Sequence, residues 1–391
     1  MVHVREIRDR AELHAIRSDW SHLLSRTRGA SFFHTWEWFE AYWRHYGDDI
    51  TRQSLRVMVV ERTSGDRSEV VGLLPLTVMR ESTRVGTVRV LTYPLHDWGT
   101  FYGPLGADPA ATISVVLAHV RRQPRDWDML DLRWVDRDGT DGGATSEALA
   151  RSGWRASTAV WKTTAWVDTR GDWGAYLADR SEKFRGNVKR LRRRLSERGP
   201  MRHVRYRPSG VTHGDNDPRW DLFDACVGLA QQSWQHDAGT GTTLSTTSIE
   251  PFLRELHAAA VELGALDLNL LMLDDRPVAY CYNYLWDGRI TGVRSGYDRG
   301  QAHLSAGAVL MGLQIEDSFA RGDRGIDLGP GYWEIKRSWA THRWESYRHT
   351  FYSWCAPRAQ ALRVKHWLNR LRHIAGDAAE SRETCAKHST G

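Results

Sequence analysis

The stretch ITGVRSGYDRGQAHLSAGAVLMGLQIEDSFARGDRGIDLGPG, residues 290–331, decides the fold. Its first part, Ile290–Tyr297, has the composition of a strand, and a polar loop follows it. Apolar residues at helical spacing then predict a helix from Ser305 to Ala320. A short apolar run, Ile326–Leu328, predicts a buried strand that ends in glycine and proline. The predicted order is therefore strand, loop, helix, strand.

Two further strands precede this stretch, and we predict them at Leu266–Leu273 and Val278–Trp286. The turns between the three strands are Asp274-Asp275-Arg276 and Asp287-Gly288. An Asp-Gly pair between apolar runs is a strong signal for a two-residue hairpin, because such turns need positive φ at their central residues. The C-terminal half therefore begins its sheet with antiparallel hairpins.

The N-terminal half repeats this order. Strands are predicted at Ser54–Glu61, Val70–Met79, Val85–Tyr93 and Met129–Trp134, with a helix from Pro109 before the last of them. Segments 56–134 and 266–331 match in order and spacing, although their sequence identity is negligible. The predicted fold class is α/β (α+β), with tandem domains that each have a mixed, mostly antiparallel sheet flanked by helices.

Three parts of the chain are expected: one domain over residues 1–165, a second over 166–360, and a basic helix with a polar tail over 361–391. The remaining predicted elements are helices at Ala11–Ser25, His34–Tyr46, Ser181–Arg198 and Asp221–Trp234, a helix opened by a capping box of Thr247 and Glu250, and a strand at Tyr347–Trp354.

Composition argues against a disordered, a membrane-spanning and a disulfide-rich protein. Hydrophobic residues make up 41% of the 391 residues, which is enough for real cores. No run of about 18 apolar residues is present, and the first residues are charged, so we expect a cytoplasmic protein without a membrane span. The four cysteines are far apart, and the histidines lack metal-ligand spacing, so the sequence predicts neither disulfides nor a metal site.

One segment carries the basic character of the chain. Between Lys183 and Arg207 there are eleven Lys or Arg and one acid, Glu197, whereas the net charge of the whole chain is only +6. The segment is either a solvated face, a site for an anionic cofactor or a track for nucleic acid phosphates. Its helix also has an apolar stripe, so it must pack on the rest of the protein.

The start of the helix at Ser305 is a candidate anion site. Ser305, Ala306, Gly307 and Ala308 are all small, so a phosphate could approach the backbone N–H groups closely. The first N–H groups of a helix have no partner within the helix, and the helix dipole also favours an anion there. Small residues at a helix start can equally be no more than a good cap.

The second candidate begins at the end of the strand that follows this helix. Asp327-Leu-Gly-Pro-Gly331 and then Glu334 and Lys336 come at a sheet edge, where α/β sites commonly form. Asp327, Glu334 and Lys336 are candidates for a general base or for a charge partner of a substrate. A surface ion pair between a carboxylate and Lys336 is the alternative.

Several stretches together resemble a known family. They are Trp36-Glu-Trp38, Gly72-Leu-Leu-Pro-Leu76, Ser181-Glu-Lys-Phe-Arg185, Ser233-Trp234, Arg276-Pro-Val-Ala279, Ser305-Ala-Gly307, and Asp327-Leu-Gly-Pro-Gly331 with Lys336 and Trp339. In this order they are similar to GNAT-superfamily (N-acetyltransferase-like) proteins of the CelD-like or BioF2-like type, relatives of the FemAB peptidyltransferases. The resemblance covers roughly residues 20–355.

The resemblance implies acyl transfer to the amine of a small molecule, a peptide, or a cell-envelope or natural-product precursor. Acyl-CoA would be the co-substrate, lying along Ile290–Tyr297 with its phosphates at Ser305–Ala308. Asp327 or Glu334, near Lys336, would help to remove the amine proton, and Tyr297 would protonate the leaving thiolate. Candidate substrate-binding residues are Asp97, Tyr102, Lys183 and Arg185.

Two alternatives remain open. The resemblance to FemAB proteins allows an aminoacyl-tRNA donor, with residues 183–207 as the RNA-binding segment. The other alternative is a catalytically inactive binding module with a GNAT fold.

The chain lacks the Arg/Gln-x-x-Gly-x-Gly/Ala loop of typical GNAT proteins, so the resemblance does not single out acetyl-CoA as the donor.

Overall fold

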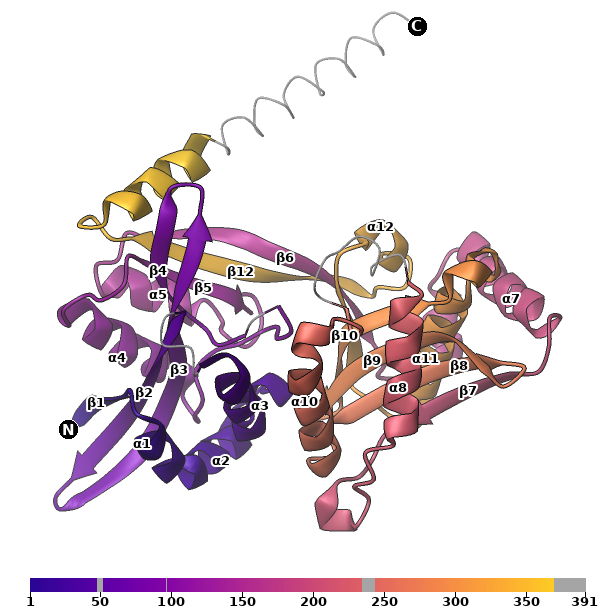
Figure 1. Cartoon of the computed structure of the whole chain (residues 1–391), viewed down its shortest axis with the longest axis horizontal. Coiled ribbons are helices and arrows are strands. Elements are labelled where there is room, and N and C mark those ends of the chain that lie inside the picture. The colour runs from indigo at the N-terminus through magenta and orange to yellow at the C-terminus, as the bar shows by residue number, and fades with distance from the viewer. Residues whose placement is uncertain (48–51, 96, 234–242, 369–391) are drawn as a thin grey trace, which may run out of the picture.

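The computed structural model describes residues 1–47, 52–95, 97–233 and 243–368. Within them, twelve strands form one sheet in the order β1-β2-β3-β4-β5-β12-β6-β11-β10-β9-β8-β7 (Figure 1). Their bounds are β1 (Val2–Ile7), β2 (Gln53–Ser64), β3 (Arg67–Thr83), β4 (Gly86–Thr92), β5 (Met129–Val135), β6 (Ser157–Asp168), β7 (Met201–Tyr206), β8 (Leu266–Leu273), β9 (Arg276–Trp286), β10 (Arg289–Tyr297), β11 (Gly325–Pro330) and β12 (His342–Tyr352).

Helices flank this sheet (Figure 1). In the N-terminal half they are α1 (Arg10–Ala15), α2 (Arg17–Arg26), α3 (Trp36–Tyr42), α4 (Pro109–Arg122) and α5 (Ala144–Arg151). In the C-terminal half they are α6 (Trp173–Ala178), α7 (Glu182–Ser196), α8 (Trp220–Gln231), α10 (Glu250–Glu262), α11 (Ala306–Arg321) and α12 (Trp333–Lys336). Residues 357–368 form a last helix. No helix in these described ranges is both long and apolar enough to cross a membrane.

The two halves repeat one architecture, which confirms the predicted tandem α/β fold. Each half has antiparallel strands that lead into a parallel pair, β4 with β5 and β10 with β11, joined by α4 and α11. The last paired residues are Thr92 with Asp131 and Thr291 with Asp327. Turn chemistry explains the hairpins of the C-terminal half, since Asp287 and Gly288 both have positive φ between β9 and β10.

The halves are joined through exchanged strands at the middle of the sheet. The last strand, β12, pairs with β5 of the N-terminal half, and β6 pairs with β11 of the C-terminal half. β6 and β12 also pair with each other over most of their length. The predicted boundary between residues 165 and 166 falls inside β6, a strand that we did not predict from the sequence.

A common core spans both halves. Phe32, near the start of the N-terminal half, packs on Tyr284 of β9 with ring centroids 4.2 Å apart. Trp38 of α3 contacts Phe252 of α10 edge to face, with centroids 5.8 Å apart. Because these aromatic side chains are fully or almost fully buried, they hold the two halves at a fixed position around the central strands.

Several predicted boundaries need correction. The helix expected over 11–25 breaks at Ile16 into α1 and α2, and the helix expected over 34–46 is α helical only in α3. The capping box of Thr247 and Glu250 is absent: Glu250 is already the first residue of α10, and the side chain of its N-cap residue makes no capping bond. Trp234, the predicted end of α8, lies outside the described residues. β1, α5, α6 and β7 were not predicted.

Candidate active site

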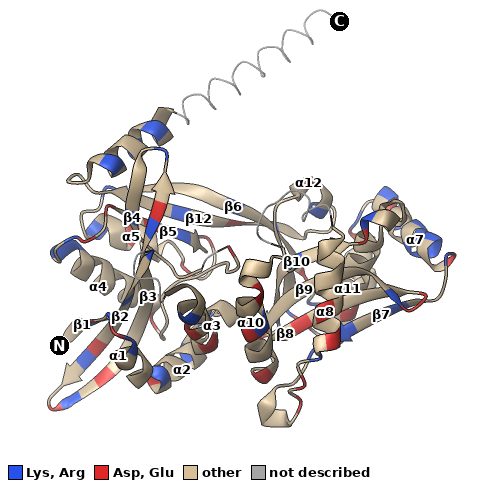
Figure 2. Ribbon diagram, viewed as in Figure 1, with Lys and Arg blue, Asp and Glu red and all other residues tan. Residues whose placement is uncertain are grey.

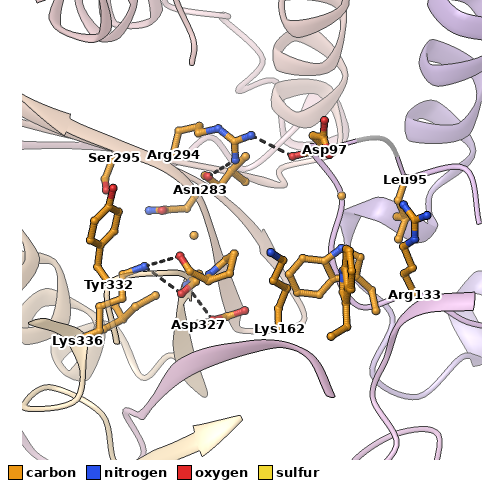
Figure 3. A pocket seen from close by; sticks show the side chains of 18 of the residues that line it. Leu95, Asp97, Arg133, Lys162, Asn283, Arg294, Ser295, Asp327, Tyr332 and Lys336 are labelled. Atoms are coloured by element: carbon orange, nitrogen blue, oxygen red, sulfur yellow. Dashed lines mark hydrogen bonds between the residues drawn. The ribbon is translucent and has the colours of Figure 1, made fainter. Parts of the chain in front are cut away.

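A cavity of about 730 Å³ lies between the two halves, where both parallel strand pairs end. Its size is within the range of small-molecule sites. Polar residues from seven elements line it: Glu81 (β3), Arg133 (β5), Lys162 (β6), Asn283 (β9), Arg294 (β10), Asp327 (β11) and Lys336 (α12). Figure 3 shows Asp327 and Lys336 close together on the side of the C-terminal half, with Arg133 on the opposite side.

β10 and β11 part at this cavity. They pair only as far as Thr291 and Asp327, and a bulge between Gly292 and Arg294 then bends β10. A Cβ atom at Gly292 would lie 2.8 Å from the carbonyl oxygen of Asp327, so only glycine fits where the strands separate. Beyond this point, none of the described strands pairs with the edge of β10 that faces β11, and a ligand amide can bind there.

Asp327 lies at the point of separation. Its side chain is buried, and Oδ1 accepts a hydrogen bond from the Gly329 N–H at 2.9 Å. Oδ2 has no hydrogen-bond partner among the described residues. Burial raises the pKa of this carboxyl to about 6, against the opposing effects of the Gly329 N–H, the Lys336 ammonium group and the Thr164 hydroxyl. A carboxylate with a free oxygen and a pKa near neutrality is suited to accept a proton.

Lys336 closes the same side of the cavity. Its Nζ donates to the carbonyl oxygens of Gly329 at 2.9 Å and Pro330 at 3.1 Å. Burial lowers the pKa of this ammonium group to about 8, although Asp327 opposes the shift. Lys336 therefore holds the backbone that follows Asp327 and places a cation near the carboxylate.

Asp131, the equivalent residue of the N-terminal half, has hydrogen-bond partners that Asp327 lacks in the described part of the chain. Asp131 ends the parallel pair of β4 and β5, as Asp327 ends that of β10 and β11. Asp131 accepts hydrogen bonds from the guanidinium groups of Arg133 and Arg348 and from the Thr350 hydroxyl. By register, the positions of the two arginines correspond to Gly329 and Thr164 in the other half. The C-terminal half therefore lacks both cations that neutralise the carboxylate in the N-terminal half.

The two halves also differ at the helix starts: among the described residues, backbone N–H groups are free at the start of α11, whereas a side chain caps the start of α4. At α11, the Ser305 side chain makes no capping bond, and the N–H groups of Ala306 and Gly307 have no partner among the described residues. At α4, the Asp108 carboxylate accepts from the Ala111 N–H, and Pro109 has no N–H to offer. An anion can bind at the start of α11, whereas a carboxylate already occupies the start of α4.

The gap between β4 and β5 is also filled by the chain itself. The backbone N–H of Tyr102 donates to the carbonyl oxygen of Trp134 at 3.0 Å, at the end of β5. The Tyr102 ring is buried and stacks on His34 with centroids 4.7 Å apart. Among the described residues, an open strand edge and an open helix start therefore occur together in the C-terminal half and not in the N-terminal half.

A family model for the acetyltransferase (GNAT) domain matches residues 182–337, which contain this strand edge, α11, Asp327 and Lys336. The segment is similar to a GNAT domain. The chain is accordingly an acyltransferase, and the resemblance to GNAT proteins read from the sequence is confirmed. The full sequence matches no curated protein.

Solved structures share the tandem fold. FemX is similar over 88% of this chain and 96% of its own, with a TM-score of 0.56 and 10% identity. The C-terminal domain of a putative lysylphosphatidylglycerol synthetase from Agrobacterium fabrum is similar over 88% and 94%, with a TM-score of 0.51 and 11% identity. L-PGS from Bacillus licheniformis is similar over 93% and 97%, with a TM-score of 0.50 and 12% identity. At such identities, the likeness establishes the fold alone.

The structure brings together some of the residues that we selected from the sequence. Asp97, Asp327 and Lys336 all line the cavity. The carbonyl oxygen of Asp97 accepts a bond from Arg294 at 3.0 Å, which ties the loop after β4 to β10 of the GNAT domain. Tyr297 lies beside the start of α11, since a Cβ atom at Gly307 would be 3.4 Å from its ring. Ser305–Ala308 form that start and do not line the cavity.

Other selected residues lie elsewhere. The Glu334 side chain is 73% exposed, pairs with Arg337 at 3.0 Å and does not line the cavity. The geometry therefore gives no support to Glu334 as the base. Tyr102 also lies outside the cavity lining. Arg185 donates to the carbonyl oxygens of Ala178 and Arg180 at the end of α6, whereas Lys183 is exposed on α7.

The basic segment 183–207 divides into two parts. The cations of α7 are mostly exposed, and Figure 2 shows Lys and Arg gathered along this helix. Arg205 and Arg207, on and after β7, are instead buried against the carboxylates of Asp267 and Asp323. These two charges are neutralised inside the protein, whereas the exposed cations of α7, together with Arg198 and Arg202, can face an anionic partner.

Sequence reasoning missed the cavity residues Arg133, Trp161, Lys162, Asn283 and Arg294. Arg294 was visible as a charged residue within the predicted strand Ile290–Tyr297. Trp161 and Lys162 had no comparable signal because they lie on β6, the strand that sequence analysis took for a domain boundary.

Proposed function

We propose that the chain transfers an acyl group from acyl-CoA to the amine of a small molecule or of a cell-envelope or natural-product precursor, with Asp327 as general base. The observation that carries this proposal is the unpartnered Oδ2 of a buried Asp327, placed where β10 and β11 part. Both possible donors, acyl-CoA and charged tRNA, are cytoplasmic molecules, so we propose the cytoplasm as the place of the reaction.

The donor would use the open groups of the C-terminal half. Its phosphates would accept hydrogen bonds from the N–H groups of Ala306 and Gly307. Its amide groups would pair with the free edge of β10, which brings the thioester carbonyl toward Asp327. The α4 start could not serve in the same way, because the Asp108 carboxylate would repel a phosphate.

The chemical step would be direct transfer. The neutral amine nitrogen attacks the thioester carbonyl carbon, a C–N bond forms and the C–S bond breaks. Asp327 takes the proton from the nitrogen, directly or through water, and Tyr297 protonates the leaving thiolate. Lys336 would position the Gly329–Pro330 backbone beside Asp327. The acceptor would enter from the side of the N-terminal half, where Asp97 and Lys162 line the cavity.

The test is amine-dependent release of free thiol from a panel of acyl-CoAs. Release that requires both an acyl-CoA and an amine supports the proposal. Asp327→Asn should then lower kcat by about 10²–10⁴-fold, the usual contribution of a general base. Asp327→Asn with wild-type kcat contradicts the role of Asp327, and thiol release with no acyl-CoA in the panel contradicts the donor class.

An aminoacyl-tRNA donor is the second candidate, because the exposed cations of α7 lie next to the proposed donor site. α7 contacts α11 and the turn that leads into it, and Arg192 pairs with Glu316 of α11 at 2.9 Å. Binding through phosphates should weaken steeply with salt. A gel shift with charged tRNA that disappears at high salt and in Lys189→Glu/Arg190→Glu favours this candidate. A salt-insensitive shift, or none, removes it.

A further inference from the structure

The helix of residues 357–368 carries two apolar faces. Its inner face packs on the protein: Ala359 and Leu362 are buried, and Leu362 contacts the core formed with β4 and β5. Its outer face bears Val364, Trp367 and Leu368, all exposed. Residues of an α-helix are about 100° apart around its axis, so these two sets lie on roughly opposite sides. A globular helix needs only the inner face.

Cations lie on both sides of the outer apolar face. With the same spacing, Arg363 falls on one side of it, and Arg358 and Lys365 fall on the other. Residues 354–368 include no Asp or Glu. Trp354, just before the helix, is also exposed, and the Arg363 guanidinium lies 5.0 Å from its ring centroid. Exposed tryptophan beside cations is typical of segments at a membrane interface.

None of the described residues covers this face. The helix lies at the end of the molecule next to the β3–β4 hairpin, as the yellow helix in Figure 1 shows. Arg358 donates to the carbonyl oxygen of Thr87 at 3.2 Å and so fixes the helix to that hairpin. Arg84, at the tip of the hairpin, is exposed and adds a further cation. Figure 2 shows blue cationic positions on both elements.

We propose that this outer face, defined by Trp354, Val364, Trp367 and Leu368, docks on an anionic lipid surface. The apolar side chains would insert at the headgroup boundary, and Arg358, Arg363 and Lys365 would contact the anionic headgroups. Charge decides for this occupant over a second copy of the chain. Two copies that met through this face would bring the same cations together, and no acid on the segment would offset them.

The experiment is co-sedimentation of the full chain with vesicles of phosphatidylcholine alone or with about 30 mol% phosphatidylglycerol. We expect binding to the anionic vesicles only. Val364→Asp/Trp367→Asp and Arg363→Glu/Lys365→Glu should each lower the partition coefficient at least tenfold. Val211→Asp, at an exposed apolar residue elsewhere, and Lys189→Glu/Arg190→Glu, on α7, should leave it unchanged.

Several outcomes overturn the proposal. They are no sedimentation of the wild type with anionic vesicles, unchanged binding by both variants of the outer face, or loss of binding only in the α7 variant. Light scattering that shows a dimer which Val364→Asp/Trp367→Asp dissociates assigns the face to a second copy. Binding that appears only when the chain is cut after Leu368 assigns the face to residues 369–391. Equal melting temperatures of the variants and the wild type ensure that lost binding is not unfolding.

Discussion

Replacement of Asp327 by Asn should change how stability depends on pH. Burial raises the pKa of Asp327 to about 6, whereas an unfolded aspartate titrates near 3.8. Between these values the folded protein binds more protons than the unfolded chain. The free energy of unfolding contributed by this group therefore falls as the pH rises from about 4 to about 6. At 1.36 kcal/mol for each pH unit, the fall is about 3 kcal/mol.

The side-chain amide of the Asp327→Asn variant cannot titrate, so this variant should lack the fall. Part of this fall already lies below pH 4, so the difference in unfolding free energy between Asp327→Asn and wild type should shift by about 2 kcal/mol in favour of the variant from pH 4 to pH 7. Urea unfolding followed by circular dichroism at pH 4, 5, 6 and 7 measures it. Other titrating groups are common to both proteins and cancel in the difference. A difference that is the same at pH 4 and pH 7 would refute the argument that burial raises the pKa of Asp327.

Asp131→Asn is the matched control, since Asp131 has the equivalent position in the N-terminal half. Its carboxylate accepts bonds from Arg133 and Arg348. The neutral amide would leave these two guanidinium groups without their shared buried acceptor. We therefore expect a loss of about 3–5 kcal/mol at neutral pH, opposite in sign to the effect at Asp327.

Three further predictions concern other residues. The kcat/KM for the amine should rise as the pH passes through about 6, because only ionised Asp327 accepts a proton. A wild-type pH profile without this rise argues against Asp327 as the general base. Tyr297→Phe should slow turnover about tenfold without lowering the melting temperature, whereas Glu334→Gln, at an exposed ion pair, should turn over at close to the wild-type rate. Slow turnover in Glu334→Gln and a wild-type rate in Tyr297→Phe would contradict both assignments. Arg205→Ala should lower the unfolding free energy by about 3–5 kcal/mol, because buried Asp267 loses one of its two arginine partners. Arg194→Ala, at an exposed residue, should change it by less than about 0.5 kcal/mol; urea titration measures both.

Local signals were sufficient for the C-terminal sheet. The Asp-Gly turn, the apolar strands and the helix from Ser305 depend on neighbours in sequence, and the structure has β9, β10 and α11 within a few residues of the predicted bounds. β6 and β7 were missed because their partners are distant. β6 pairs with β11 and β12, and Arg205 on β7 is buried only because Asp267, Asp317 and Asp323 surround it.

The site was likewise predictable only where its residues are close together in the sequence. Asp327 lies on a short predicted strand and Lys336 follows soon after it, so their proximity can be anticipated from the sequence. Lys162 and Arg133 reach the cavity only through the exchange of β6 and β12 between the halves, which no local pattern indicates. The difference between Asp131 and Asp327 likewise depends on Arg348, more than two hundred residues from Asp131 in sequence.

We propose that the start of α11 holds the donor phosphates. Gly307 and Ala110 are both the second residue of their helices, α11 and α4, and a side chain at Gly307 would make only an ordinary contact with the Tyr297 ring. Calorimetric titration of CoA, which carries the phosphates common to all acyl-CoAs, into the wild type, Gly307→Asp and Ala110→Asp therefore tests it most directly. We predict that Gly307→Asp weakens binding at least tenfold and that Ala110→Asp leaves it unchanged. Binding that survives Gly307→Asp, or that is lost in Ala110→Asp, would contradict the account.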